Sequence, residues 1–292
     1  MNITGRTGVA LLILFVFCLT IGARHPAPVK GTPKTDLTAE EIIARSITAL
    51  GGQDALDKIK TRIIRATYHN VTDPCGEGAF EFYQKADKYL NVTHQACLSD
   101  LIGEKEGFDG KIFWRGSLLG EVLKGSNLEA LKTRSRISGY GLKIGITPET
   151  NWKLFYDSAE VLLGFEVSGQ PKESAANADS YVLKFSPLEG SATIKVYDKS
   201  SFLLTRIYVT QTVIAGAGPV LTRTELSDYR FIDGVRIPFV ICLTDSVGFF
   251  YRITKLTEVK NNIPIDDSVF NKPDLPFSRG EINKGLSNSL SK

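Results

Sequence analysis

The chain has 292 residues, of which 42% are hydrophobic and 23% are charged, and its formal net charge is +3. This length can bury a sizeable core, and the composition excludes an intrinsically disordered chain. A nucleic-acid-binding protein usually carries a concentrated basic face. The longest basic cluster here is the short segment 132–136, so we expect no nucleic-acid partner.

The first 23 residues have the order of a secretory signal peptide. Arg6 supplies a positive charge, an apolar run extends over 9–21, and the small residues Gly22 and Ala23 follow it. The run is short for a membrane-spanning helix. We therefore predict an exported protein from which residues 1–23 are removed, with an uncleaved N-terminal anchor as the alternative.

Residues 24–37 contain three prolines and are predicted to form an extended tether. A helix is predicted to begin at Thr38, because Glu41 three residues later completes a capping box and apolar residues then recur at helical spacing. Gly51 and Gly52 are predicted to end this helix, because glycine readily adopts the left-handed conformation of a helix stop. A short second helical turn is predicted over 53–60.

From residue 62 the hydrophobic pattern changes to the alternation that is typical of strands. We predict strands near 62–71, 77–85, 88–95, 104–109, 111–116, 160–168, 180–187, 191–198, 202–212, 220–232, 235–244 and 248–259. A capping box at Ser126 and Glu129 predicts a helical interruption within 126–150. Tight turns such as Asp233-Gly234 imply antiparallel neighbours, so the predicted fold class is mainly β (α+β). One β domain is predicted over 38–274, followed by a loose polar tail over 275–292.

The alternation also gives the predicted sheet one apolar face. The residues predicted to line this face are Phe80, Phe82, Tyr181, Leu183, Phe185, Ile237, Phe239, Phe249 and Tyr251. Few helices are available to cover so long a face. Either the face encloses a space that binds an apolar ligand, or its own large side chains fill the interior; the pattern leaves both open.

Three cysteines follow the predicted signal peptide. Cys75 and Cys97 flank a predicted hairpin centred on Ala86, and folding this hairpin brings them close enough for a disulfide, which export permits. Two free thiols are the alternative. Cys242 alternates with apolar neighbours and is predicted to be a buried small hydrophobic residue.

The sequence contains none of the common catalytic or metal-binding motifs. It has no HExxH, CxxC or GxSxG motif and no glycine-rich phosphate loop, and His69 and His94 are isolated on predicted strands. We therefore predict a protein that is not an enzyme and needs no cofactor or metal.

Four segments resemble the bacterial outer-membrane lipoprotein-sorting (LolA/LolB-like) periplasmic superfamily. They are Ala49–Lys60 (ALGGQDALDKIK), Phe108–Trp114 (FDGKIFW), Asp228–Pro238 (DYRFIDGVRIP) and Asn261–Phe270 (NNIPIDDSVF). The resemblance extends over about 38–274. The cysteine pair and the insertion over 126–151 do not correspond to features of that superfamily.

The resemblance implies an unclosed β-barrel of about eleven antiparallel strands, with a helical lid over an apolar cavity. It implies a periplasmic, non-catalytic and monomeric carrier of lipid or lipoprotein acyl chains, acting with membrane lipoprotein machinery, with association with the outer membrane left open. The alternative is a packed periplasmic accessory module of a membrane complex that binds no small ligand. An exported hydrolase that depends on His69 or His94 is the weakest hypothesis.

Overall fold

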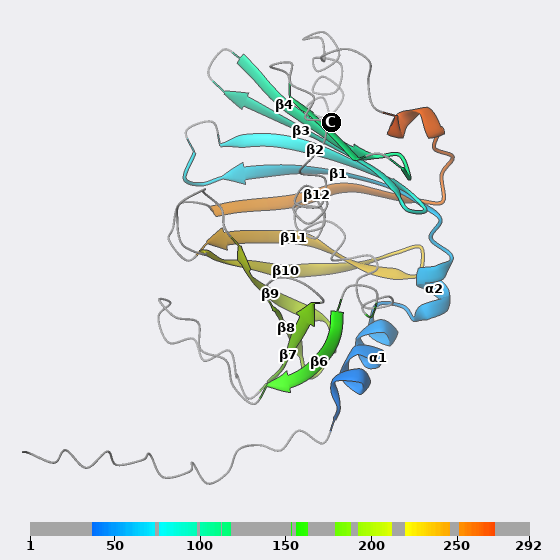
Figure 1. Ribbon diagram of the computed structural model, residues 1–292, viewed down its shortest axis with the longest axis vertical. Coiled ribbons are helices and arrows are strands. Elements are labelled where there is room, and N and C mark those ends of the chain that lie inside the picture. Colours follow the sequence, from blue (N-terminus) through cyan, green and yellow to red (C-terminus); the bar gives the residue numbers. More distant parts are fainter. Residues whose placement is uncertain are drawn as a thin grey trace, which may run out of the picture. The chain divides into compact units, whose positions relative to one another are not determined.

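The computed structural model describes residues 37–73, 76–97, 100–111, 113–117, 153, 156–162, 179–187, 192–211, 220–245 and 251–271. Helices α1 (Ala39–Ala49) and α2 (Gln53–Asp57) precede the strands, and the short 3-10 helix η2 (Asp267–Phe270) follows them (Figure 1). The strands are β1 (Thr61–Asn70), β2 (Glu77–Lys85), β3 (Lys88–Cys97), β4 (Asp100–Phe108), β5 (Phe113–Ser117), β6 (Tyr156–Leu162), β7 (Ser180–Pro187), β8 (Thr193–Asp198), β9 (Leu204–Gln211), β10 (Val220–Ile232), β11 (Val235–Asp245) and β12 (Tyr251–Asn261). The predicted signal peptide, the helical interruption within 126–150 and the polar tail lie outside the described residues.

The twelve strands form one sheet in the order β5-β4-β3-β2-β1-β12-β11-β10-β9-β8-β7-β6. Every neighbouring pair is antiparallel, and most neighbours follow each other in the chain. The pairing of β1 with β12 joins the two halves of the chain. No pairing of β5 with β6 closes the sheet within the described residues. The predicted mainly β, antiparallel and unclosed fold is therefore confirmed, with twelve strands instead of about eleven.

Helix α1 begins and ends where the sequence predicts. The Thr38 backbone N–H donates to Glu41 Oε2 at 2.7 Å, and the Glu41 N–H donates to Thr38 Oγ1 at 3.2 Å, which completes the capping box. Gly51 and Gly52 follow the helix with φ values of +124° and +86°. The Leu50 carbonyl accepts from the Arg236 N–H at 2.8 Å, so the end of α1 is fixed to the start of β11.

The Asp233-Gly234 turn connects β10 and β11 as a two-residue hairpin. Ile232 pairs with Val235 across it, and the central residues have φ values of +51° and +83°. Two positive φ values are typical of the type I′ turn, whose twist matches that of the flanking strands. This predicted turn is confirmed.

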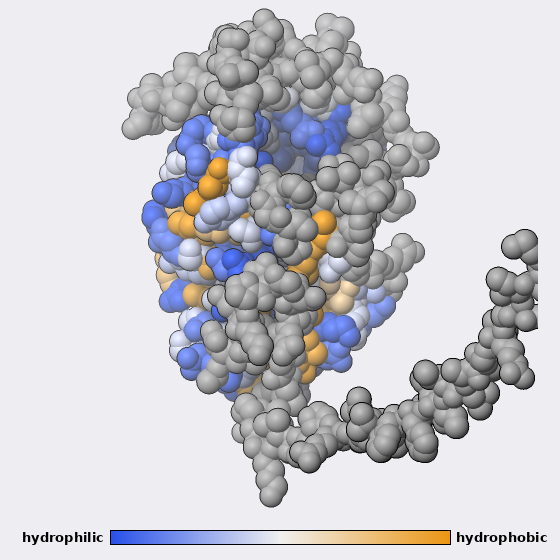
Figure 2. Space-filling view, turned by 90° about the vertical axis from the view of Figure 1, so that its left-hand side faces the viewer, coloured by the Kyte–Doolittle hydropathy of each residue, from blue (hydrophilic) through white to orange (hydrophobic). Residues whose placement is uncertain are grey.

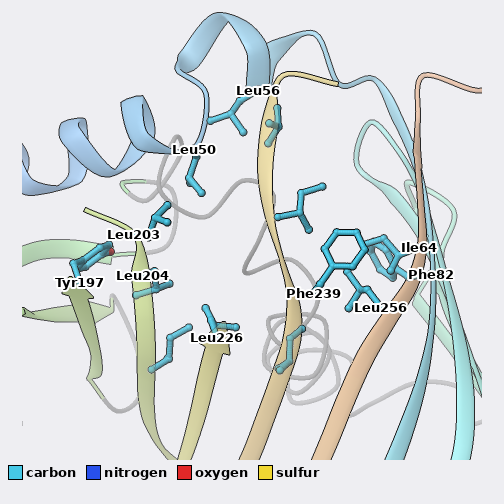
Figure 3. Close-up of a cluster of buried hydrophobic side chains, with 14 of the residues drawn as sticks. Leu50, Leu56, Ile64, Phe82, Tyr197, Leu203, Leu204, Leu226, Phe239 and Leu256 are labelled. Carbon is cyan, nitrogen blue, oxygen red and sulfur yellow. The ribbon is translucent and has the colours of Figure 1, made fainter. Parts of the chain in front are cut away.

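One face of the sheet, called the inner face here, packs with both helices into the largest hydrophobic cluster (Figure 3). In Figure 3, Leu50 and Leu56 lie at the helical end of this inner cluster, between side chains of the β8–β10 region and those of β1, β2, β11 and β12. Its buried members are Ala39, Ile42, Ile43, Leu50, Leu56, Ile64, Ala66, Tyr68, Phe80, Phe82, Tyr89, Tyr156, Leu183, Phe185, Tyr197, Leu203, Leu204, Ile207, Leu226, Val235, Ile237, Phe239, Ile241 and Leu256. The helices thus cover part of the apolar face, as expected from the sequence.

A second cluster lies on the opposite, outer face of β3 and β5. There Trp114 packs with Leu90, Val92 and Phe270. Its indole lies on Gly107, where an added Cβ would be 2.6 Å from the ring. The Trp114 Nε1–H donates to the Phe270 carbonyl at 2.9 Å, so this side chain fixes η2 to the sheet.

Replacing Trp114 with Phe is expected to lower the free energy of unfolding by about 1–3 kcal/mol, because the buried Phe270 carbonyl loses its donor. Urea unfolding followed by circular dichroism measures this change. Limited proteolysis after residue 262 should become faster at the same time, because η2 is released before the sheet unfolds. An unchanged unfolding midpoint would show that the indole hydrogen bond does not stabilise η2.

Candidate ligand-binding face

The inner cluster contains most of the side chains that the sequence predicts to line a binding face. Phe80 and Phe82 come from β2, Leu183 and Phe185 from β7, and Ile237 and Phe239 from β11; all six side chains are buried. Tyr181 is half-buried and packs against the same cluster. The sheet therefore brings together residues that are more than 150 positions apart in the sequence.

The prediction is wrong for the direction of Tyr251, and Phe249 lies outside the described residues. Leu243 pairs with Arg252, and Ile241 pairs with Thr254. Directly paired residues point to the same face of a sheet, so Arg252 and Thr254 share the inner face with Ile241, while Tyr251 points to the outer face. Strand β12 carries apolar residues on both faces, and only its pairing with β11 decides which set points inward.

Three cations on the inner face were not predicted as site residues. The first, Lys195, has a side chain that is only 1% exposed. Its Nζ lies 4.5 Å from the centroid of the Phe185 ring and 5.7 Å from that of Tyr156. Such cation–π contacts stabilise a desolvated ammonium group, so Lys195 is held by the aromatic residues of the cluster.

The second cation, Arg252, lies near the end of β1 that is remote from α2. Its guanidinium carbon lies 4.4 Å from the centroid of the Tyr68 ring, and its Nε–H donates to Asn70 Oδ1 at 2.7 Å. Burial lowers the pKa of Arg252, which remains paired with these neighbours. Strand β1 ends on the left in Figure 1. Figure 2 shows the molecule from that side, where hydrophobic residues lie between hydrophilic ones.

The third cation, Arg62, lies at the α2 end of β1 and has a side chain with no exposed surface. Its Nε–H donates to Asn261 Oδ1 at 2.6 Å, and Asn261 Nδ2 donates to Asp233 Oδ2 at 3.1 Å. Among the residues that the structure describes, Nη1 and Nη2 have no hydrogen-bond partner. Burial lowers the pKa of Arg62 to about 9, although the nearby Asp233 carboxylate acts in the opposite direction.

In sequence, no protein-family model and no curated protein matches this chain. Its fold is similar to that of a DUF1329 family protein from Desulfovibrio piger, with 14% identity and a TM-score of 0.51 over 79% of this chain and 95% of that chain. A LolA superfamily protein from Nitrosomonas europaea matches with 12% identity and a TM-score of 0.43 (81% and 98%). A domain from Vibrio parahaemolyticus, titled as an outer-membrane lipoprotein-sorting protein domain, matches with 10% identity and a TM-score of 0.47 (78% and 97%).

Its structural neighbours are DUF1329 and LolA-superfamily proteins. The similarity of fold rests on the Desulfovibrio structure, which is the one of the three with a TM-score above 0.5. At 14% identity this likeness describes the fold alone, because one fold can carry many functions.

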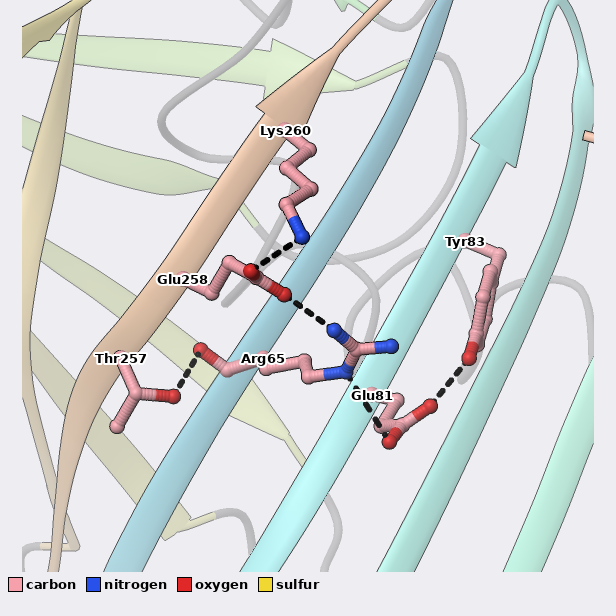
Figure 4. Close-up of polar contacts among 6 residues, drawn as sticks. All are labelled: Arg65, Glu81, Tyr83, Thr257, Glu258 and Lys260. Carbon is pink, nitrogen blue, oxygen red and sulfur yellow. Dashed lines mark hydrogen bonds and ion pairs between the residues drawn. The ribbon is translucent and has the colours of Figure 1, made fainter. Parts of the chain in front are cut away.

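Arg65 lies on the same strand as Arg62 but points to the outer face, where its side chain is partly exposed and paired with carboxylates (Figure 4). Its Nε lies 3.3 Å from Glu81, its Nη1 is bonded to Glu258, and Glu81 also accepts from the Tyr83 hydroxyl. Burial alone would lower the pKa of Arg65, but these carboxylates outweigh it and raise the pKa above its ordinary range. Arg65 is a matched counterpart of Arg62: the same residue type, three positions away, with carboxylate partners.

The described residues contain no group of three or more His, Cys, Asp or Glu side chains that could hold a metal ion. His69 lies 2.8 Å from Glu77 and is half-exposed, whereas His94 is buried. Burial raises the pKa of Cys242, which is half-buried, and so keeps its thiol protonated at neutral pH.

The predicted disulfide stays a prediction, because Cys75 and the side chain of Cys97 lie outside the described residues. The backbone pairing of β2 with β3 is described, and Gly78 lies opposite Gln95. Continuing this register places position 76 opposite 97, one residue from the pair that the sequence suggests.

Within the part of the chain that the structure describes, no helix is both long and apolar enough to cross a membrane.

Proposed function

We propose that this protein is an exported, non-catalytic binding or carrier protein for lipid or lipoprotein acyl chains, and that its inner face holds the ligand. The observation that carries the proposal is the composition of that face. Aromatic and aliphatic side chains from both sides of an unclosed sheet, such as Phe82 of β2 and Phe185 of β7, gather under α1 and α2. A periplasmic location and a monomeric state belong to the same proposal.

An acyl chain needs little more than such a surface. Burying a C16 chain is worth roughly 10 kcal/mol at about 0.8 kcal/mol per methylene, before the cost of ordering the chain and the protein. No metal, cofactor or catalytic group takes part.

A packed accessory module of a membrane complex is the second candidate. It is favoured by the burial of the inner-cluster side chains, which are at most 8% exposed and would also suit an interior filled by the protein itself. Such a module would bind its partner through an outward surface.

Native mass spectrometry of the purified protein distinguishes the two candidates. If the protein is a carrier, lipid is expected to co-purify with it. After this lipid is removed, the protein is expected to bind a fluorescent fatty acid. A protein that stays ligand-free, ignores the fluorescent probe and is crosslinked to a partner protein would contradict the carrier and support the accessory module.

A lysine at Val209 is expected to weaken fatty-acid binding at least about tenfold, because an acyl chain on the inner face would have to desolvate the new ammonium group. Val209 packs against the inner cluster from β9. Thr210, the next residue, points to the other face beside Leu221, so Thr210→Lys is the matched control. Equal affinities of the two variants in a fluorescence titration, with both still folded, would place the ligand elsewhere.

A further inference from the structure

The Arg62 guanidinium is an unusual feature of the inner face, because its two terminal nitrogens are buried and no described residue forms a hydrogen bond with them. Its side chain has no exposed surface, and it forms no ion pair within the described residues. A buried charge normally has a counter-charge or a complete set of hydrogen bonds. The other two cations of this face lie on aromatic rings: the Arg252 guanidinium lies on Tyr68 and bonds to Asn70, and Lys195 lies on the Phe185 ring.

The guanidinium is also held in one orientation. Asn261 accepts from Nε, and Asp233 in the β10–β11 turn in turn holds the Asn261 amide. The planar group therefore presents its free edge, Nη1 and Nη2, in a fixed direction. Two parallel N–H donors of an arginine match the two oxygens of a carboxylate or of a phosphate.

Arg62 lies at one end of a row of inner-face side chains on β1. The next inner-face residues of the strand are Ile64, Ala66 and Tyr68, each at most 2% exposed. At about 3.3 Å per residue, the path from Arg62 to Tyr68 is roughly 20 Å long. Apart from the Tyr68 hydroxyl, which donates to the His94 carbonyl, these side chains are apolar, and Arg62 lies at one end of the row.

We propose that Arg62 binds the anionic group of an amphipathic ligand, a carboxylate or a phosphate, whose acyl chain lies along the inner face. This inference rests on the proposed function and narrows its substrate class from apolar ligands in general to anionic lipids. The lowered pKa of Arg62 is consistent with it, because the Asp233 carboxylate offsets only part of the effect of burial and an anion at Nη1 and Nη2 would add a second, directly bonded counter-charge.

Isothermal titration calorimetry with three probes of one chain length tests the inference: dodecanoate, dodecyl phosphate and dodecanol. The wild-type protein is expected to bind the two anionic probes at least about tenfold more tightly than dodecanol. In Arg62→Met the anionic probes should lose at least about tenfold in affinity, while dodecanol binding stays within about threefold. Arg65→Met removes the same charge from the outer face and should change none of the three affinities more than about threefold.

The outcomes separate this inference from the proposed function. Equal wild-type affinities for all three probes would overturn the role of Arg62 and leave an apolar carrier. Binding of none of them would contradict the carrier itself. Binding of inorganic phosphate at Arg62 without any of the amphiphiles would show a site for a free anion and overturn the lipid proposal. The wild-type comparison decides between these outcomes even if Arg62→Met fails to fold.

Discussion

Alanine in place of Gly51 is expected to destabilise the protein by about 3–6 kcal/mol. Gly51 has a φ of +124°, a conformation that costs an L-residue about 1–3 kcal/mol. A Cβ at this position would also lie 2.1 Å from the carbonyl oxygen of Gly234. Because that contact is with backbone, no side-chain rotation relieves it, and separating the two segments adds a cost comparable to overpacking a core.

Gly52→Ala is the matched control for this prediction. Gly52 also has a positive φ, +86°, but an added Cβ would have nothing within 4 Å. The Gly52→Ala substitution should therefore lower the free energy of unfolding only by the cost of the strained backbone conformation, about 1–3 kcal/mol. Urea unfolding of both variants measures the difference. If they were equally destabilised, the close approach of α1 to the β10–β11 turn would not be important for stability.

Gly51 and Gly234 also show how far the sequence determines the fold. Each local signal, the capping box at Thr38, the glycine stop and the Asp233-Gly234 turn, was predicted correctly because its cause lies within a few residues. The contact between the two glycines was not predictable, since it joins positions 183 residues apart. The order of strands followed from short antiparallel connections, but the pairing of β1 with β12 did not.

The candidate site was less predictable for the same reason. Alternation correctly grouped residues such as Phe80 with Phe82, yet it assigned Tyr251 to the wrong face of β12, because β12 has apolar residues on both faces. The charged residues of the inner face were not predicted as site residues, because the alternation of apolar residues identifies only hydrophobic positions. In the case of Arg62, the alternation with Ile64, Ala66 and Tyr68 was a signal that could have identified it as an inward-pointing cation.

Replacing Arg62 with Met is expected to raise the free energy of unfolding by about 1–4 kcal/mol at pH 7, in protein freed of ligand. Lowering the pKa of Arg62 from its ordinary value to about 9 corresponds to about 5 kcal/mol, at 1.36 kcal/mol per pKa unit, as an upper bound on the cost of burying this charge. The loss of the hydrogen bond to Asn261 offsets part of the gain. Replacing an incompletely paired buried cation by an apolar side chain is commonly neutral or stabilising by such amounts. Thermal and urea unfolding of delipidated protein measure the change.

The pH dependence distinguishes the buried charge from a change in packing. Below pH 9 both the folded and the unfolded chain carry the proton on Arg62, so the folded protein bears the full cost. Between pH 9 and 12.5 the unfolded chain keeps this proton and the folded chain releases it, so the contribution of Arg62 becomes less unfavourable as the pH rises. The advantage of Arg62→Met should therefore be largest near neutral pH and shrink by about 2 kcal/mol at about pH 10.5.

Arg65→Met, which removes an arginine already paired with Glu81 and Glu258, should instead cost about 1 kcal/mol. A destabilised Arg62→Met at neutral pH would show that the guanidinium stabilises the fold.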